Sequence, residues 1–289
     1  MNFKENQNSS FSKKPDWLKI KLPKAREYSY LKEYLSKYNL HTICESGNCP
    51  NIGECWNNKT ATFMILGDIC SRSCSFCAVK TGKPLPPDYH EPIRIAEVIR
   101  DMKLKHCVIT SVDRDDLPDG GSDIWAQTIV SIKNLNPETT IESLIPDFKG
   151  NKTFIKKIID AGPNIISHNL ETVEKLTKVV RVQAKYDRSL DVLKFISSSG
   201  IKTKSGIMLG LGEKDEEIIQ TMDDMLNAGC KIITIGQYLQ PSKKHLPVDR
   251  YVNPDEFENY KSIAMRKGFE YAECGPLVRS SYHAEKRII

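Results

Sequence analysis

Strand-like and helical segments alternate along residues 61–268, and this alternation predicts an α/β fold. The predicted strands are Thr62–Leu66, Cys107–Ser111, Thr139–Leu144, Asn164–His168, Lys202–Met208 and Lys231–Ile235. The predicted helices lie near Ile93–Lys103, Asp123–Leu135, Thr153–Ala161, Thr172–Val179, Ser189–Ser199, Glu216–Ala228 and Asp255–Arg266. Regular alternation implies right-handed βαβ units and a parallel sheet. A closed eight-fold barrel needs about 250 residues, so these six strands predict an open, partial (β/α)6 TIM-type barrel.

Composition and motifs divide the chain into four predicted regions. We expect a disordered N-terminus (1–16), an N-terminal extension (17–60), the barrel (61–268) and a C-terminal tail (269–289). Residues 1–16 are polar and lack the apolar stretch of a secretory signal. Apolar residues at helical spacing predict an amphipathic helix over Arg26–Tyr38. Both extensions are expected over the barrel mouth, where parallel α/β folds place their ligands.

The composition is that of an ordinary globular protein. Hydrophobic residues make up 39% of the 289 residues and charged residues 27%, which are usual values. No apolar run approaches the roughly 20 residues of a membrane span, so we expect no membrane association. The net charge of +5 is spread along the chain without a dense basic block, so we expect no nucleic-acid partner. With no export signal we predict a cytoplasmic protein, in which nine cysteines indicate metal ligation more than disulfides.

Three cysteines with C-x3-C-x2-C spacing follow the first predicted strand: Cys70, Cys74 and Cys77. Structural zinc is the competing interpretation, but it usually takes four protein ligands, commonly as two separated pairs. The bacterial ferredoxin run has a different spacing and ends in Cys-Pro. Three thiolates on a four-iron cube leave one iron open to a ligand. The spacing, with Phe76 before the last cysteine, resembles the signature loop of the radical S-adenosylmethionine (SAM) superfamily.

A second cysteine group lies upstream with C-x4-C-x5-C spacing: Cys44, Cys49 and Cys55. Nearby glycines and a proline predict a loop that can wrap a metal cluster. A zinc knuckle with a borrowed ligand is an alternative that this spacing alone leaves open. Beside the first motif, a second iron–sulfur cluster is favoured. The remaining cysteines, Cys107, Cys230 and Cys274, have no partner spacing and are expected to be buried as small hydrophobic residues.

Polar residues at strand ends are candidates for a ligand site. Ser111 ends the second predicted strand, and the charged run Asp113-Arg114-Asp115-Asp116 follows it. A solvated turn explains this run almost as well as a site does. Glu142 lies within the third strand, where a buried acid needs a partner that a ligand hydroxyl or ammonium can supply. His168 and Asn169 end the fourth strand, although a lone histidine there is more often structural than catalytic.

Several longer motifs, together with both cysteine groups, resemble those of the lipoyl synthase family over residues 17–284. They are Cys-Pro-Asn-Ile-Gly-Glu-Cys-Trp (49–56), Thr-Ser-Val-Asp-Arg-Asp-Asp-Leu-Pro-Asp-Gly-Gly (110–121), Ser-His-Asn-Leu-Glu-Thr-Val (167–173), Gly-Gln-Tyr-Leu-Gln-Pro-Ser-Lys-Lys-His-Leu-Pro-Val (236–248) and Arg-Ser-Ser-Tyr (279–282). Several such motifs in the right order leave little room for coincidence. The resemblance implies a partial barrel of the radical SAM kind.

The resemblance also implies SAM and two [4Fe–4S] clusters as cofactors. One cluster, which binds and reductively cleaves SAM, would be held by Cys70, Cys74 and Cys77. An auxiliary cluster would be held by Cys44, Cys49, Cys55 and a serine of the tail. Neither spacing nor chemistry separates the two serines; Ser281 is taken as the ligand, with Ser280 as the alternative. The expected catalytic residues are thus Cys70, Cys74, Cys77 and Ser281, and the expected cofactor-binding residues are Phe76, Ser111, Glu142 and Asn169.

In this family the substrate is an octanoyl chain, amide-linked to a lysine of a lipoyl carrier protein or domain. The resemblance implies that a 5′-deoxyadenosyl radical takes hydrogen from unactivated methylenes and that sulfur of the auxiliary cluster enters at C6 and C8. A serine alkoxide is a harder and more easily lost iron ligand than thiolate, which suits a cluster that comes apart. The expected partners are the octanoylated carrier, an electron donor such as flavodoxin or ferredoxin, and an iron–sulfur carrier for cluster repair.

Two other functions fit part of the sequence. Another auxiliary-cluster radical SAM sulfurtransferase, acting on a small molecule or tRNA, would share the Cys70 motif but not the Cys44 motif together with the serine tail. The second alternative function is that of a non-enzymatic electron carrier or zinc-binding module. Six βα units with charged strand ends are far more scaffold than that role needs.

Overall fold

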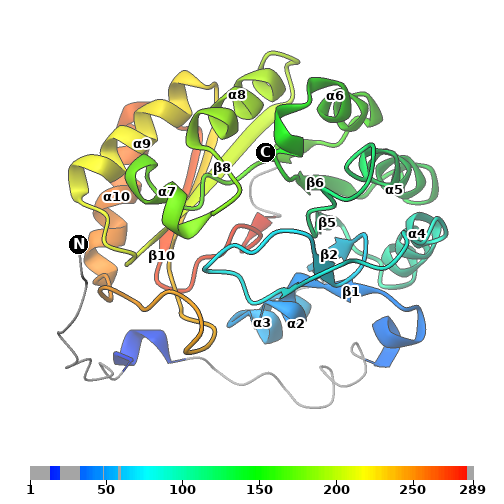
Figure 1. The fold of residues 1–289 in the computed structure, drawn as a ribbon, viewed down its shortest axis with the longest axis horizontal. Coiled ribbons are helices and arrows are strands. Elements are labelled where there is room, and N and C mark those ends of the chain that lie inside the picture. Colours follow the sequence, from blue (N-terminus) through cyan, green and yellow to red (C-terminus); the bar gives the residue numbers. More distant parts are fainter. Residues whose placement is uncertain (1–13, 20–32, 48, 58–59, 285–289) are drawn as a thin grey trace.

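The computed structural model describes residues 14–19, 33–47, 49–57 and 60–284 (Figure 1). The predicted disordered N-terminus lies almost wholly outside these residues, and Asp16 begins a short 3-10 helix, η1 (Asp16–Leu18). Most of the predicted helix Arg26–Tyr38 also lies outside them, although residues 33–37 are helical. The prediction of N-terminal disorder therefore stays a prediction.

The centre of the molecule is an eight-stranded sheet in the order β1-β2-β5-β6-β7-β8-β9-β10. The strands are β1 (His41–Thr42), β2 (Ala61–Ile65), β5 (His106–Ser111), β6 (Thr140–Leu144), β7 (Ile165–Ser167), β8 (Lys202–Leu209), β9 (Ile232–Gln237) and β10 (Tyr271–Gly275). β1 pairs antiparallel with β2, and every other neighbouring pair is parallel. All six predicted strands are present to within a few residues, which confirms the parallel α/β fold.

The sheet has two strands more than the six predicted, β1 in the N-terminal extension and β10, which was expected to belong to the C-terminal tail. This strand pairs in parallel with β9, so that Tyr271 lies beside Ile232 and Gly275 beside Gly236. Its sequence, Tyr-Ala-Glu-Cys-Gly, contains no β-branched residue and gives little strand signal of its own. The buried neighbouring strand supplies what the local sequence lacks. Within the described residues β1 and β10 are the two edges of the sheet order, as expected for an open barrel.

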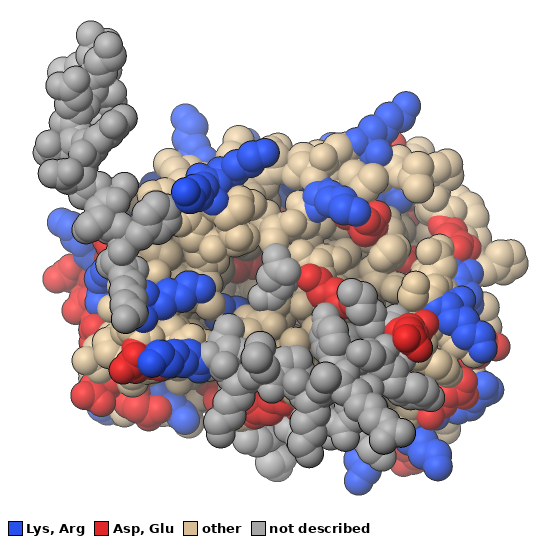
Figure 2. All heavy atoms as spheres, turned by 90° about the horizontal axis from the view of Figure 1, so that it is seen from below, with Lys and Arg blue, Asp and Glu red and all other residues tan. Residues whose placement is uncertain are grey.

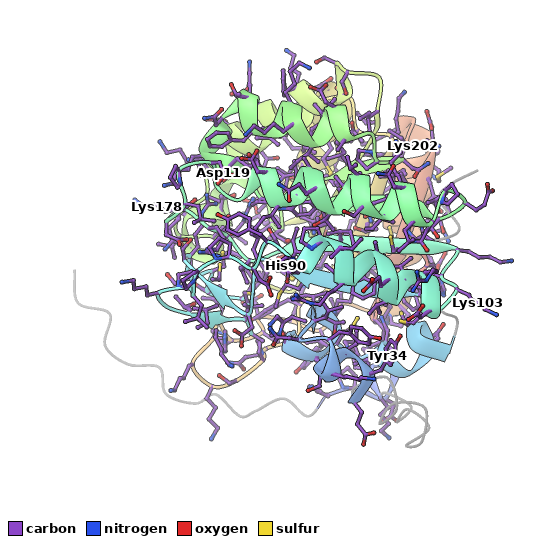
Figure 3. All side chains as sticks on the ribbon, turned by 90° about the vertical axis from the view of Figure 1, so that its right-hand side faces the viewer. Tyr34, His90, Lys103, Asp119, Lys178 and Lys202 are labelled. Carbon is purple, nitrogen blue, oxygen red and sulfur yellow. The ribbon has the colours of Figure 1, made fainter. Side chains whose placement is uncertain are left out.

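Helices cover the outside of the curved sheet, as Figure 1 shows. They are α4 (Glu91–Asp101), α5 (Ser122–Leu135), α6 (Lys152–Ala161), α7 (Glu174–Val180), α8 (Tyr186–Ser197), α9 (Asp215–Asn227) and α10 (Pro254–Lys267). All seven predicted helices are present. In Figure 3, α4, α5 and α6 lie side by side, with Asp119 and Lys178 at one edge of the molecule and Lys103 and Lys202 at the opposite edge. The first edge carries the loops that follow the strands, where a ligand site is expected.

The apolar core lies between the sheet and its helices, in two parts. One part contains Ile99, Trp125 and Ile129 from α4 and α5. The other contains Met222 and Phe257 from α9 and α10. Cys107, Cys230 and Cys274 are buried, as predicted. Because apolar contacts are concentrated on the outward faces of the strands, polar side chains can occupy the interior of the barrel.

The surface carries mixed charge. On the described part of the face seen in Figure 2, Lys and Arg side chains are spread among Asp and Glu side chains. Within the described residues, none of the helices has the length and apolar character needed to span a bilayer.

Candidate functional site

The first cysteine motif forms a loop at the carboxyl end of β2, here called the Cys70 loop (residues 70–77). Leu66 and Gly67 have φ angles of 70° and 92° and turn the chain out of the strand. β3 (Ile69–Cys70) then pairs in parallel with β4 (Lys80–Thr81), so both ends of the loop are joined. The loop is therefore a closed segment that carries its three thiols at the barrel mouth.

The thiols of this loop lie half-buried beside main-chain N–H donors. Main-chain N–H groups of Arg72 and Asp113 donate to Cys70 Sγ at 3.4 and 3.3 Å, and such donors favour a bound thiolate. Burial raises the pKa of Cys74 to about 12 and that of Cys77 to about 11, so a metal must displace these protons. Within the described chain, no three His, Cys, Asp or Glu side chains are arranged around a single metal ion. The donor set fits three ligands of an iron–sulfur cluster.

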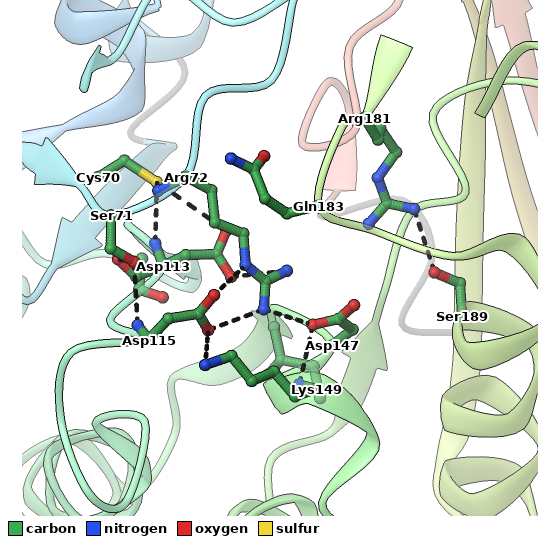
Figure 4. A network of polar contacts seen from close by, with 12 residues as sticks. Cys70, Ser71, Arg72, Asp113, Asp115, Asp147, Lys149, Arg181, Gln183 and Ser189 are labelled. Carbon is green, nitrogen blue, oxygen red and sulfur yellow. Dashed lines mark hydrogen bonds and ion pairs between the residues drawn. The ribbon is translucent and has the colours of Figure 1, made fainter. Parts of the chain in front are cut away.

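Arg72 fastens the Cys70 loop to the barrel (Figure 4). Its side chain is only 3% exposed and contacts the carboxylates of Asp115 at 2.7 Å, Asp147 at 2.8 Å and Asp113 at 3.3 Å. Asp113 and Asp115 follow β5 and Asp147 follows β6, so one guanidinium joins the Cys70 loop to the ends of two strands. Burial opposes ionisation of Asp147, yet the nearby Arg72 holds the pKa of that carboxyl well below its usual range. The charged run after β5 is thus part of the site and not simply a solvated turn.

The end of α7 and the segment after β9 also hold the Cys70 loop. The main-chain N–H of Ser75 donates to Val180 O at 3.0 Å, and Ser75 O accepts from the N–H of Leu246 at 3.1 Å. His245 Nε2 lies 2.9 Å from Cys77 O and donates to it. Arg72 and His245 were not predicted as site residues. The only available signal was their position inside motifs already identified.

The second cysteine group forms the Cys44 segment (residues 44–55), and it is not the simple loop that was predicted. It overlaps two short helices, α2 (Ile43–Ser46) and α3 (Ile52–Asn57). Thr42 explains the first of these helices, because its hydroxyl accepts the Glu45 N–H as an N-cap. Cys44 is buried, Cys49 and Cys55 are half-buried, and burial raises the pKa of Cys49. Like the Cys70 loop, this segment offers three closely spaced thiols, which fit three ligands of an iron–sulfur cluster.

The end of the chain returns to the Cys44 segment. In this C-terminal segment (residues 277–284), Leu277 O accepts from Asn51 Nδ2 at 2.6 Å, and Tyr282 OH donates to Glu54 at 3.1 Å. These contacts join residues 226 and 228 positions apart. The nearby Cys49 also interacts electrostatically with Arg279. The Arg-Ser-Ser-Tyr motif therefore lies beside the second cysteine group.

The two serines of that motif differ in their surroundings. Ser280 Oγ donates to Asn169 Oδ1 at 3.3 Å, and Ser280 O accepts from Lys204 Nζ at 2.5 Å. Among the residues that the structure describes, the Ser281 hydroxyl has no hydrogen-bond partner. Ser280 is thus engaged by the barrel, whereas the Ser281 side chain is available.

Three of the expected cofactor-binding residues lie at the mouth of the barrel. Ser111 ends β5, and its hydroxyl accepts from Trp125 Nε1 at 3.2 Å. Asn169 follows β7 and donates to the Glu171 carboxylate at 3.0 Å. Phe76 is half-buried in the Cys70 loop. Ser111 and Asn169 thus lie at strand ends and Phe76 lies in the loop after β2, at the edge of the sheet where parallel α/β folds bind ligands.

Glu142 and His168 are buried and have partners within the chain. Glu142 is fully buried and pairs with Lys204 Nζ at 2.5 Å, so the partner that its burial requires is a lysine. Ile145 O and Ser189 Oγ each lie 2.9 Å from a ring nitrogen of His168. Burial lowers the pKa of His168 to about 4, so the ring is neutral near pH 7. His168 has the structural role that was expected of it.

Comparison with protein families supports the resemblance seen in the motifs. The protein family described as "Radical SAM superfamily" matches residues 64–225. The family described as "N-terminal domain of lipoyl synthase of Radical_SAM family" matches residues 2–49. The chain is 57% identical to "Lipoyl synthase" of Christiangramia forsetii, with 95% of this chain and 94% of that protein covered. It is 59% identical to "Lipoyl synthase, mitochondrial" of Nematostella vectensis, with 95% of each covered.

Solved structures with low sequence identity share the fold. "Crystal structure of HydG: A maturase of the [FeFe]-hydrogenase" matches with a TM-score of 0.59 and 16% identity, covering 74% of this chain and 50% of that one. SuiB of Streptococcus suis, bound to its precursor peptide SuiA, matches with a TM-score of 0.58 and 14% identity, covering 86% and 53%. These likenesses concern the fold alone.

Proposed function

Because the chain belongs to the lipoyl synthase family of the radical SAM superfamily, we propose that it makes the lipoyl cofactor by inserting sulfur at C6 and C8 of a protein-bound octanoyl chain. The substrate would be an octanoylated lipoyl carrier protein or domain. An electron donor such as flavodoxin or ferredoxin and an iron–sulfur carrier for repair would complete the set of partners. The cytoplasmic location remains a prediction.

Each cysteine group is assigned one [4Fe–4S] cluster. Cys70, Cys74 and Cys77 would hold the cluster that binds SAM, and Cys44, Cys49 and Cys55 would hold the auxiliary cluster with Ser281, or alternatively Ser280. When bound, the first cluster would supply the electron for reductive cleavage of SAM, and the second would supply sulfur.

The protein contributes position and environment. Two main-chain N–H groups would stabilise a bound Cys70 thiolate, and Arg72 keeps its loop fixed on the ends of two strands. Phe76, Ser111 and Asn169 are proposed to contact SAM. Glu142, the fourth expected cofactor-binding residue, is instead paired with Lys204 inside the barrel. The barrel walls would keep water away from a reactive radical, which would otherwise take hydrogen from unintended groups.

One observation carries the proposal beyond a general radical SAM enzyme: the contact between the C-terminal segment and the Cys44 segment. The Asn51–Leu277 and Tyr282–Glu54 hydrogen bonds bring the serine motif to the second cysteine group. A sulfurtransferase that used only the Cys70 loop would have no need for this long-range contact. The contact supports a fourth, serine ligand on an auxiliary cluster.

The direct test is mass spectrometry of an octanoylated carrier domain after anaerobic incubation with the reconstituted protein, SAM and a reductant. The proposal expects a product that has gained two sulfur atoms on the octanoyl chain. A carrier domain that stays unmodified while 5′-deoxyadenosine accumulates would contradict the assigned substrate.

A further inference from the structure

The interior of the barrel contains a buried ammonium group that the proposed chemistry does not use. Lys204 projects from β8 with a fully buried side chain, and Glu142 on β6 is equally buried. Their charged groups lie 2.5 Å apart, and Ser167 Oγ donates to the same carboxylate oxygen at 3.0 Å. A buried ion pair loses the hydration of both charges and contributes little stability by itself. Stabilisation of the barrel therefore does not explain why this buried ion pair is present.

A contact of the ammonium with the C-terminal segment supplies that explanation. Lys204 Nζ donates to Ser280 O at 2.5 Å, and the two residues are 76 positions apart. Ser280 Oγ is held as well, because it donates to Asn169 at 3.3 Å. A cation that hydrogen-bonds a main-chain carbonyl can fix a chain segment whatever side chain the residue carries.

The barrel wall beside this contact is shaped for the tail. A Cβ built on Gly236 of β9 would lie 2.1 Å from the main-chain oxygen of Val278. The φ angle of Gly236 is not in the left-handed region, so glycine is required there by the close approach of the tail and not by its own conformation. The C-terminal segment is therefore held on its barrel side by β8 and β9.

We propose that Lys204, with Glu142 as its counter-ion, is a positioning residue that docks the C-terminal segment in the barrel and so leaves Ser281, not Ser280, for the auxiliary cluster. Ser280 is held through both its carbonyl and its hydroxyl. Ser281 is the next residue, and the Tyr282 hydroxyl already reaches Glu54 of the Cys44 segment. This inference rests on the proposed function for the cluster and on the structure alone for the docking.

The test compares the full chain with the double variant Glu142→Gln/Lys204→Met, which removes both buried charges together and avoids leaving one unpaired. Hydrogen exchange over residues 277–284 is expected to become about 10- to 100-fold faster, the range for losing one hydrogen bond from a charged donor. Lys202→Met is the matched control, because Lys202 also lies on β8 but pairs with Glu270 at 3.9 Å. Its exchange in the C-terminal segment should equal that of the wild type.

Gly236→Ala tests the docking without touching the buried charges. The added methyl group would collide with the main-chain oxygen of Val278, so exchange in residues 277–284 should rise as it does in the double variant. This variant also keeps the test decisive if removal of the ion pair prevents folding.

A spectroscopic measurement separates positioning from mere structural support. In a background with Cys70, Cys74 and Cys77 replaced by alanine, only the auxiliary cluster should contribute to Mössbauer spectra. The double variant and Gly236→Ala should each alter that spectrum, whereas Lys202→Met should not. Unchanged exchange in the two test variants, or an unchanged spectrum despite faster exchange, would overturn the positioning role. If the background chain binds no iron, the proposed function fails, while hydrogen exchange still decides whether Lys204 holds the tail.

Discussion

The two cysteine regions are held in different ways. The Cys70 loop is fastened by Arg72, a nearly buried guanidinium that contacts three carboxylates on two strand ends. The Cys44 segment is joined to the C-terminal segment by hydrogen bonds that include the Asn51–Leu277 contact and the contact of Tyr282 with Glu54, whose side chain is 51% exposed. A charged network out of water is rigid, whereas exposed polar contacts are weak and exchange readily. The Cys70 loop is therefore held rigidly, whereas the exposed part of the contact between the Cys44 segment and the C-terminal segment can loosen.

This difference matches the proposed division of labour. A cluster that delivers electrons must return unchanged after each cycle, so its ligand loop benefits from rigidity. A cluster that gives up sulfur must come apart and be rebuilt, so its fourth ligand and the exposed contact between the C-terminal segment and Glu54 benefit from being weak, while the barrel keeps the C-terminal segment itself in place. The predictions below test this contrast, beginning with the largest expected effect.

Replacing Cys70, Cys74 and Cys77 by alanine should abolish SAM cleavage and lower the iron content from roughly eight to roughly four atoms per chain, since each triad suits one four-iron cube. Iron analysis and chromatography of 5′-deoxyadenosine provide the two measurements. Cys230→Ala is the control, because this thiol is buried away from both groups. A triple variant that still forms 5′-deoxyadenosine would remove the basis of the comparison.

Arg72→Met should destabilise the protein by about 3 kcal/mol, because it leaves buried Asp147 and its neighbours without their cation. The loss should appear as a lower Tm together with faster hydrogen exchange in residues 70–77. Arg100→Met should change stability by less than about 0.5 kcal/mol, since Arg100 is 51% exposed and pairs with the adjacent Asp101. Equal effects of the two substitutions would mean that the Cys70 loop is not held by this network.

Glu91 should make the stability of the first region depend on pH. Burial raises its pKa to about 7, although its carboxylate accepts the Leu66 N–H at 2.8 Å. Because the folded pKa lies above the unfolded value, the neutral acid stabilises the fold at low pH. That contribution is lost as pH rises from about 4.5 to about 7, by up to about 3 kcal/mol.

Thermal unfolding at several pH values checks this expectation. Relative to Glu91→Gln, the wild type should lose stability between pH 5 and pH 8, whereas the exposed residue Glu258 should give no such difference when replaced by glutamine. A wild-type curve parallel to that of Glu91→Gln over this range would show that Glu91 does not titrate as described.

Tyr282→Phe should have the smallest effect, because it removes only the hydrogen bond from the Tyr282 hydroxyl to the exposed Glu54 carboxylate. We expect a stability change below about 1 kcal/mol and exchange that is faster in residues 277–284 but unchanged in residues 70–77. Faster exchange in both regions would indicate that they are coupled and not separately held.

Local sequence was enough to predict most of the fold and to pick out the two cysteine groups. Alternating strands and helices and the spacing of Cys70, Cys74 and Cys77 depend on residues close together in the chain. Contacts made by strand register were not predictable in this way. Arg72 meets Asp147, and Glu142 meets Lys204, only after distant strands have paired. β10 and the short helices of the Cys44 segment were missed because neighbouring strands and an N-cap decide them more than local propensity does.

The most direct test of the division of labour uses the chain with Cys44, Cys49 and Cys55 replaced by alanine and the other cluster fully loaded. Incubation with SAM, a reductant and an octanoylated carrier domain, followed by mass spectrometry, measures 5′-deoxyadenosine and sulfur in the product together. We expect 5′-deoxyadenosine to form while the octanoyl chain gains no sulfur. Loss of SAM cleavage with the Cys70 cluster intact, or sulfur in the product, would contradict the assignment of separate roles to the two cysteine regions.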